Sequence, residues 1–184
     1  RKIRLMIFSI IIPVYNEEKT ILKILEKLKK LEFSKFEKEV LVINDGSTDN
    51  TKKILDENRN LYNQLYSNNK NEGKGSAVKI GLQKCTGEYV VFQDADLEYD
   101  PIDLLKFEDV FIKFKADGII GSRFSYDKYI RSHSILNKIA NFFLTLFFNI
   151  LYNTTFTDVY SCYFAFNKKL LNVNNLKING FAQH

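Results

Sequence analysis

The acidic side chains most able to do chemistry in this chain follow an apolar run. Asp94, Asp96 and Glu98 come directly after residues 89–92, Tyr-Val-Val-Phe, which have the composition of a buried strand. Carboxylates at the surface end of such a strand suit a divalent cation that is held against phosphate oxygens. A solvated acidic turn that ends at Asp100 is the structural alternative, and one Asp-x-Asp does not decide between them.

Two further polar segments follow apolar runs in the same way. Residues 13–17 and 44–49 each come after a run of Ile, Val and Leu. Ligands of open parallel sheets bind outside the carboxyl ends of the strands, so the three polar segments are expected to meet in one site. There we expect Glu17 and Asp45 to accept hydrogen bonds from a nucleoside, while the rest of 44–49 suits a turn and a helix cap.

The spacing of Asp94 and Asp96 indicates different roles for the two carboxylates. Along an extended strand they would point to opposite sides, unless the strand has already bent. One is then expected to bind metal directly, and the other to hold a sugar hydroxyl or a metal-bound water. Glu98 continues the alternation and is a candidate second ligand. Mg²⁺ or Mn²⁺ would bridge these oxygens to a diphosphate and offset the charge on a leaving nucleotide.

Basic residues near these segments are candidates for phosphate binding. Lys74 lies in a glycine-containing stretch that does not match G-x-x-x-x-G-K-[ST], and no G-x-G-x-x-G opens the first expected helix. This disfavours P-loop and dehydrogenase functions but leaves Lys74 as a contact for base or phosphate. Arg123 and Arg131 suit a second anionic group, because guanidinium binds phosphate bidentately. The alternative is an ion pair with Asp117 or Asp127.

An alternation of strands and helices must position these residues. Apolar runs alternate with helical patterns, which favours an α/β fold with a mainly parallel sheet. The expected strands span residues 8–14, 40–43, 64–67, 89–93, 118–124 and 160–166. The expected helices span residues 20–31, 48–58, 74–84 and 101–114, the last with Pro101 in its first turn.

Residues 135–152 predict a helix of a different kind, because apolar side chains cover most of its circumference. Asn137, Asn141, Thr145 and Asn149 recur every four residues and share one face. The apolar runs are shorter than the roughly 20 residues that span a bilayer. Core packing and contact with a membrane or partner are the two interpretations.

The composition is that of an ordinary globular domain. The 184 residues suffice for one domain with a full core, and 45% are hydrophobic. A net charge of +5 permits a nucleotide or an acidic membrane as partner and does not indicate nucleic acid. Cys85 and Cys162 lack metal-ligand spacing and suit reduced thiols. The chain begins without Met and shows no signal peptide, so we expect a fragment.

Together these segments resemble family 2 inverting glycosyltransferases, and among them the polyprenyl-phosphate sugar synthases that include dolichyl-phosphate mannose and glucose synthases. The resemblance covers nearly the whole chain, with Asn44 where the family usually has Asp. It rests on five segments in the family's order: PVYNE at 13–17, NDGSTD at 44–49, GKG at 73–75, DADLE at 94–98 and GSRF at 121–124. It implies the GT-A fold and one catalytic domain over residues 1–184, truncated at the C-terminus.

The resemblance also implies a reaction and its residues. A polyprenyl or dolichyl phosphate would attack the sugar of GDP-mannose or UDP-glucose in a single inverting displacement. The acceptor phosphate is largely ionised at neutral pH and needs no strong general base. Pro13, Tyr15, Glu17, Asp45, Lys74 and Asp94 would bind the nucleotide sugar, Asp96 and Glu98 the metal, and Arg123 and Arg131 the lipid phosphate; Asp94, Asp96, Arg123 and Arg131 would form the catalytic set.

By the same resemblance the enzyme acts at the cytoplasmic face of a membrane, with the apolar helix at its surface. One alternative is transfer to a sugar hydroxyl in cell-surface glycan synthesis, which needs an acidic residue beyond a Gly-Phe pair; here Gly180-Phe181 precede only three residues. Another is a nucleotide-sugar binding module without turnover. The absence of Trp disfavours processive synthases, and the lack of a Gly-rich, Arg-containing loop after the first strand disfavours nucleotidyltransferases.

Overall fold

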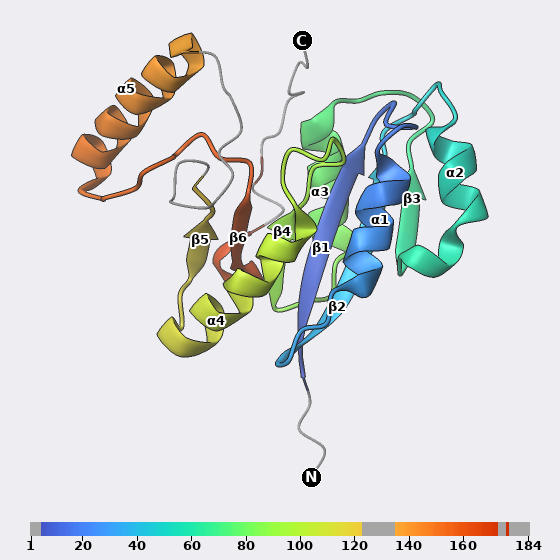
Figure 1. Cartoon of the computed structure of the whole chain (residues 1–184), viewed down its shortest axis with the longest axis horizontal. Helices are drawn as coiled ribbons and strands as arrows, with labels where there is room; N and C mark the ends of the chain where they lie inside the picture. The colour runs from blue at the N-terminus through green and yellow to red at the C-terminus, as the bar shows by residue number, and fades with distance from the viewer. Residues whose placement is uncertain (1–4, 123–134, 173–175, 177–184) are drawn as a thin grey trace.

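The chain folds around one six-stranded sheet (Figure 1). The computed structural model describes residues 5–122, 135–172 and 176. The strands are β1 Met6–Val14, β2 Phe36–Asn44, β3 Gln64–Ser67, β4 Tyr89–Phe92, β5 Gly118–Ile120 and β6 Phe164–Asn167. The α-helices are α1 Ile21–Lys30, α2 Thr51–Glu57, α3 Lys74–Lys84, α4 Leu104–Phe114 and α5 Ile135–Tyr152, and short 3₁₀ turns span Arg59–Leu61, Pro101–Asp103 and Lys168–Leu170.

The strand order is β3-β2-β1-β4-β6-β5, and the first four of these strands are parallel. β6 runs antiparallel to both β4 and β5. Val14 pairs with Asn44, and Ile11 pairs with Phe92, so β1, β2 and β4 end at the same edge of the sheet. The expected mainly parallel α/β fold is confirmed, and the three polar segments follow strand ends that lie side by side.

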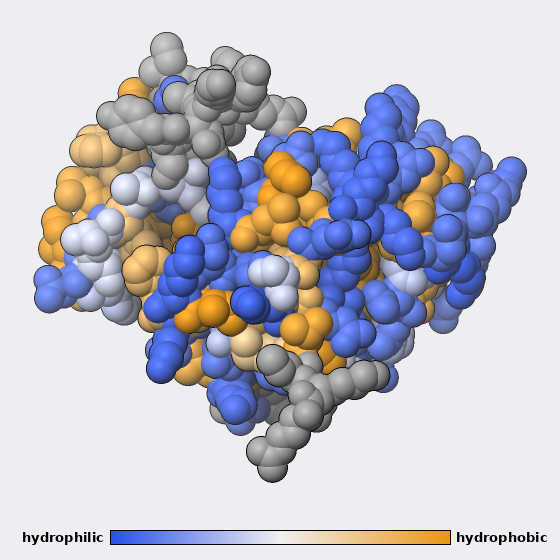
Figure 2. All heavy atoms as spheres, turned by 60° about the horizontal axis from the view of Figure 1, so that its bottom comes forward, coloured by the Kyte–Doolittle hydropathy of each residue, from blue (hydrophilic) through white to orange (hydrophobic). Residues whose placement is uncertain are grey.

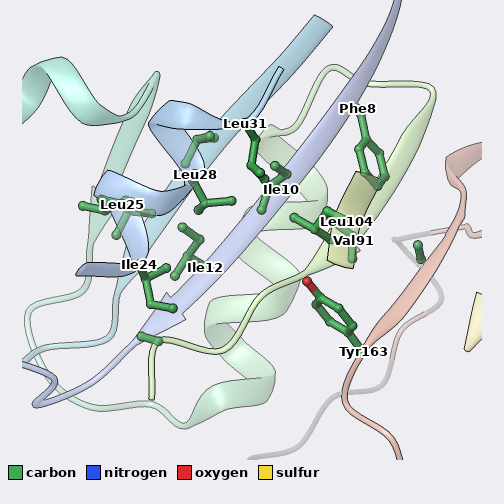
Figure 3. Packing of buried hydrophobic residues seen from close by; sticks show 14 of the residues in the cluster. Phe8, Ile10, Ile12, Ile24, Leu25, Leu28, Leu31, Val91, Leu104 and Tyr163 are labelled. Carbon is green, nitrogen blue, oxygen red and sulfur yellow. The ribbon is translucent and has the colours of Figure 1, made fainter. Parts of the chain in front are cut away.

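Helices cover both faces of the sheet. The side chains of β1 alternate between these two faces, so each face needs its own apolar cover. Ile10 and Ile12 pack against α1 and α4, whereas Ile11 packs against α3 on the opposite face. Figure 3 shows Ile24 and Leu28 of α1 turned toward β1. Each such fully buried side chain contributes about 1.5–3 kcal/mol relative to an exposed one. The strand ends are therefore carried by a rigid, two-sided core.

Most expected elements are present, and β3, α3 and α5 have the expected bounds. β2 begins at Phe36 rather than residue 40, because Phe36 pairs with Met6 and donates its N–H to a carboxylate oxygen of Glu108 at 3.1 Å. β6 begins at Phe164 rather than residue 160, because the N–H of Cys162 donates to the Tyr99 hydroxyl instead of a strand, at 3.2 Å. β5 ends at Ile120, and residues 123–134 lie outside the described part.

Helix α5 buries part of its polar face and exposes apolar side chains, which is the reverse of an ordinary surface helix. Asn141 and Thr145 of its polar stripe are buried, where the Asn141 amide donates to Asp158 Oδ1 at 3.1 Å and Thr145 Oγ1 accepts the Val159 N–H at 3.2 Å. Apolar side chains gather at the left of Figure 2, on the side that α5 occupies in Figure 1. Core packing is therefore the wrong interpretation for most of this helix. Its exposed large apolar residues are Leu136, Ile139, Phe142, Phe143, Leu144, Leu146, Phe147, Ile150, Leu151 and Tyr152.

A bilayer-crossing helix was not expected from the sequence. In the part of the chain that the structure describes, no helix is both long enough and apolar enough to cross a membrane.

Candidate active site

A pocket lies where β1, β2 and β4 end. Ten residues line it, and seven of them are predicted from the sequence: Pro13, Tyr15, Glu17, Asp45, Lys74, Asp94 and Asp96. Val14, Ala77 and Ala95 complete the lining. Glu98 does not line the pocket, and Arg123 and Arg131 lie outside the described residues. The structure thus brings most of the predicted donor site together, and the assignment of the two arginines to a lipid phosphate stays a prediction.

The turn after β1 is tied to the turn after β2. Asn16 has a φ of 55°, in the left-handed region that Asn adopts more readily than most residues. Its side-chain oxygen accepts the N–H of Thr48 at 2.8 Å. The N–H of Glu17 donates to Thr51 Oγ1, also at 2.8 Å. These bonds fix the pocket residues of the β1 end relative to Asp45.

Asp45 is buried, and its carboxylate already has partners within the protein. It accepts hydrogen bonds from the Asn68 amide at 2.7 Å, from the Gly73 N–H at 2.8 Å and from the Glu72 N–H at 3.1 Å. A carboxylate that accepts several N–H groups is held in one orientation. Asp45 therefore organises the loop 68–73 as well as lining the pocket.

Gly46 allows that loop to lie close to the β2 end. Its φ is +69°, and a Cβ at this position would lie 2.4–2.7 Å from main-chain atoms of Lys70 and Asn71. No side chain fits in that space, so glycine is required for the close approach. In the turn expected for residues 44–49, the Ser47 N–H donates to Asn44 Oδ1 at 3.1 Å. The expected cap within these residues is not observed: Asp49 Oδ1 accepts the N–H of Thr51 at 2.9 Å, but the N-cap of α2 is Asn50, whose side chain makes no capping hydrogen bond.

Lys74 and Asp94 form an ion pair inside the pocket. The Lys74 ammonium lies 2.5 Å from Asp94 Oδ1, with side-chain exposures of 32% and 15%. Burial lowers the pKa of Lys74, but the adjacent Asp94 carboxylate outweighs it, so this pKa lies above its ordinary value. Lys74 is therefore charged at neutral pH, at the first position of α3 and beside the acidic segment.

Asp96 carries negative charge that the described residues do not neutralise with an ion pair. Partial burial raises the pKa of Asp96, and the nearby carboxylates of Asp94, Glu98 and Glu17 raise it further. The Glu98 N–H, which donates to Asp96 Oδ1 at 2.8 Å, lowers this pKa but does not outweigh the other effects. β4 ends at Phe92, so the strand has already bent before the two aspartates, and both line one pocket. Asp94 and Asp96 therefore do not point to opposite sides, as they would along an extended strand.

The pocket fits a hard divalent cation that takes part of its coordination from a ligand. Among the described residues, no three His, Cys, Asp or Glu side chains gather closely enough to hold a metal by themselves. Mg²⁺ is usually bound through one or two carboxylates plus substrate phosphates and water, not through an all-protein cage. The excess negative charge around Asp96 suits that arrangement, with Asp96 as the protein ligand.

Sequence reasoning missed the residues that hold the pocket without lining it. Asn16 and Asn68 bond the loops around Asp45, and Gln93 is fully buried immediately before Asp94. The turn preference of Asn was a usable signal for Asn16. Gln93 was placed at the end of an apolar strand, and nothing in the sequence showed what its amide would bond.

A comparison with protein families identifies the chain. The model described as Glycosyl transferase family 2 matches residues 9–173. The chain belongs to this family. The fold is that of the GT-A glycosyltransferases, as was expected from the sequence motifs.

Among curated relatives, the chain is 30% identical over 181 residues to the UDP-N-acetylglucosamine–dolichyl-phosphate N-acetylglucosaminyltransferase of Methanococcus voltae. The match covers 89% of this chain and 70% of that protein. The chain spans only 58% and 19% of the length of two other curated relatives that it matches.

Solved structures of similar proteins have the same fold. S. aureus TarS with UDP-GlcNAc superposes with a TM-score of 0.56 and 34% identity, over 62% of this chain and 34% of that one. Glucosyl-3-phosphoglycerate synthase from Mycobacterium tuberculosis, in complex with Mn²⁺, UDP and glucosyl-3-phosphoglycerate, reaches a TM-score of 0.68 at 20% identity. This second match covers 90% of this chain and 58% of the synthase and shows the fold alone.

Proposed function

We propose that the chain transfers a sugar from a nucleotide sugar to a polyprenyl or dolichyl phosphate, with inversion at the anomeric carbon. The observation that carries the proposal is the single pocket in which Asp45, Lys74, Asp94 and Asp96 meet at three strand ends. The M. voltae relative supports the acceptor class, because its name specifies dolichyl phosphate.

The donor is a nucleoside diphosphate sugar. Tyr15, Glu17 and Asp45 bind the nucleoside, and Lys74 places its charge near the diphosphate. GDP-mannose and UDP-glucose are the donors expected from the sequence. The M. voltae enzyme is named for UDP-N-acetylglucosamine, and TarS is solved with UDP-GlcNAc, so UDP-sugars come first in a donor panel.

Asp96, supported by Asp94, is the proposed protein ligand of Mg²⁺ or Mn²⁺, and Glu98 remains a candidate through water. When bound there, the cation would supply positive charge that offsets the negative charge on the departing diphosphate. The acceptor phosphate oxygen forms the new bond to the anomeric carbon, while the bond to the diphosphate breaks and its electron pair leaves with the nucleotide. Because a phosphate monoester is largely ionised at neutral pH, no residue of the chain has to remove a proton.

The exposed apolar face of α5 supports a place at a membrane surface, where a polyprenyl phosphate is embedded. Phe142, Phe143 and Phe147 are each more than 60% exposed on this face. An amphipathic helix with such a face lies in the bilayer interface and does not cross it. We therefore propose that the chain works peripherally at the cytoplasmic face of a membrane.

A transfer assay tests the function. The purified protein is given polyprenyl phosphate, Mg²⁺ or Mn²⁺ and each of several labelled nucleotide sugars, and label entering the organic phase is counted. Metal-dependent transfer from one donor, lost in Asp96→Asn and retained in the matched surface variant Asp109→Asn, is the expected result. Donor binding without transfer to lipid contradicts the lipid acceptor.

A hydroxyl acceptor is the second candidate, and the match to S. aureus TarS favours it. TarS is named as a poly(ribitol-phosphate) β-N-acetylglucosaminyltransferase and is 40% identical over 112 residues, 59% of this chain. In the same assay, label that stays in the aqueous phase on an added glycan or polyol phosphate polymer identifies this acceptor class.

A further inference from the structure

The segment that carries Asp94 and Asp96 has no regular secondary structure of its own. β4 ends at Phe92, and the next element, a 3₁₀ turn, begins at Pro101. Leu97 within the segment has a φ of 64°, in the left-handed region that is unfavourable for a residue with a Cβ. Contacts from outside the segment must therefore hold the two carboxylates in place.

The side-chain amide of Gln93 joins the two ends of this segment. Its Nε2 donates to the main-chain carbonyl of Asp94 at 3.1 Å and to that of Tyr99 at 3.2 Å. Gln93 is fully buried, and its own N–H donates to Ile11 O of β1 at 3.0 Å. The main chain of Gln93 is thus fixed to β1, and its side-chain amide bonds the segment at its first residue and again five residues later.

Tyr163 fixes the orientation of that amide. Its hydroxyl lies 3.1 Å from Gln93 Oε1 and 3.2 Å from Asp100 O, both of which are acceptors. The ring stacks on Tyr99, with centroids 4.8 Å apart, and Figure 3 shows it entering the core near Leu104 and Val91. Because Oε1 faces the hydroxyl, Nε2 must face the two carbonyls of the segment.

The polar atoms of the Gln93 amide are therefore all directed at the segment or at Tyr163. A buried amide without partners would destabilise the fold, and an apolar residue would end β4 without that risk. These hydrogen bonds fix the position of residues 94–100 and do not pair one strand with another. They do not touch the loop 68–73 or the β1 turn, which hold the nucleoside side of the pocket.

We propose that Gln93, oriented by Tyr163, is a positioning residue for the Asp94–Asp96 segment and acts on recognition of the metal and diphosphate, not of the nucleoside. The inference rests on the proposed function, since it concerns the same donor pocket. It assigns this chain a second set of site residues, none of which contacts the donor.

Calorimetric binding of UDP and of uridine, with and without Mn²⁺, tests this role; GDP and guanosine replace them if the wild type prefers guanine. Gln93→Met keeps the approximate size of the side chain and removes the amide, while Tyr163→Phe removes only the hydroxyl. Tyr62→Phe is the matched control, because the Tyr62 hydroxyl also donates to a main-chain carbonyl, Leu55 O at 2.8 Å, away from the segment.

In Gln93→Met the gain in UDP affinity that Mn²⁺ provides is expected to fall about 10- to 100-fold, because loss of a group that orients metal ligands lowers metal affinity to this extent. Uridine affinity stays within about twofold. Tyr163→Phe shows a smaller loss of the same kind, and Tyr62→Phe shows none. Equal losses for uridine and UDP, or unchanged Mn²⁺-dependent affinity in both variants, overturn the proposal.

Hydrogen–deuterium exchange without ligand separates this proposal from the proposed function. Residues 94–100 should exchange at least about tenfold faster in Gln93→Met, with the loop 68–73 unchanged. If the wild type binds no nucleotide, the proposed function fails, and the exchange result still decides whether Gln93 holds the segment. Unchanged exchange at 94–100 contradicts the positioning role whatever the ligand is.

Discussion

At the scale of single residues, Asp45 has two tasks that are linked. Its carboxylate holds the loop 68–73 through Asn68, Glu72 and Gly73 while it lines the pocket. A site whose side chains are held by other hydrogen bonds is pre-organised for its ligand. Loss of this carboxylate should therefore affect both stability and nucleotide binding.

Asp45→Ala removes the buried carboxylate that accepts hydrogen bonds from Asn68, Glu72 and Gly73. We expect the free energy of unfolding to fall by about 2–3 kcal/mol, since hydrogen bonds to charged groups are the stronger class. Nucleotide affinity should fall by more than the loss of folded protein explains. Urea unfolding and calorimetry measure the two effects. Asn68→Ala, which removes one of the bonds, is the control; an equal effect from both variants would show that Asp45 has no role beyond that single bond.

Asp49 allows a test of pH dependence at a residue away from the metal. Burial raises its pKa, but hydrogen bonds from Thr51 and from the Glu18 N–H at 3.2 Å outweigh it, so the pKa in the folded state lies below its ordinary value. A depressed carboxyl pKa stabilises the fold above the unfolded value of about 3.9, and this contribution is lost as the pH falls through the lower folded value.

The expected result concerns the difference in unfolding free energy between the wild type and Asp49→Asn. This difference should stay constant from pH 7 to about pH 5 and shrink below about pH 3.9, where the carboxylate becomes protonated. Urea titrations at a series of pH values measure it. A difference that grows toward pH 3 would mean that the carboxylate is not stabilised in the fold.

Most site residues could be predicted at this scale because they follow apolar strands as polar types. Glu17, Asp45, Asp94 and Asp96 were found in this way. Lys74 was found from its glycine-containing stretch, and Pro13 and Tyr15 from the resemblance to family 2 glycosyltransferases; all seven residues line the pocket. Gln93 could not be found, because a buried amide is recognisable only by its partners, and Tyr163 is 70 residues away in sequence. The roles given to Arg123, Arg131 and Glu98 stay predictions.

At the scale of elements, the sequence predicted the bounds of α3, which follows a glycine-containing loop, and of α5, whose polar residues recur every four positions. The first residues of β2 were missed for a physical reason. Residues 36–39 read Phe-Glu-Lys-Glu, and their strand conformation depends on pairing with β1 and on the distant Glu108. Local propensity does not contain such long-range contacts.

Helix α5 makes the most specific prediction at this scale. Phe143 and Phe147 are 62% and 63% exposed and lie one turn apart, so they share the outward face. Burial of each Phe in a bilayer interface is worth about 1.5–3 kcal/mol. The double variant Phe143→Glu and Phe147→Glu should bind vesicles of anionic phospholipid at least about tenfold more weakly than the wild type, by sedimentation.

Phe114→Glu is the matched control for this experiment, because Phe114 is 75% exposed on α4 and is not part of the α5 face. Its vesicle binding should equal that of the wild type. Equal weakening in the control would point to charge repulsion instead of a specific face. Unchanged binding in the double variant would remove α5 from the membrane contact.

At the scale of the whole molecule, the sequence predicted the α/β class and the meeting of three polar segments at one edge. It did not predict that β6 inserts antiparallel between β4 and β5. That position depends on residues 164–167 returning to the sheet after α5, a non-local pairing with no local pattern. Because β6 pairs with β4, it also carries Tyr163 to the acidic segment.

The central claim is that the pocket at the ends of β1, β2 and β4 binds a nucleotide sugar through a metal. A crystal structure with UDP and Mn²⁺, including the anomalous signal of manganese, tests it most directly. The account predicts one manganese peak in contact with the Asp96 carboxylate and the diphosphate, with the nucleoside beside Asp45 and Tyr15. A nucleotide bound elsewhere, or a manganese peak away from Asp96, would contradict it.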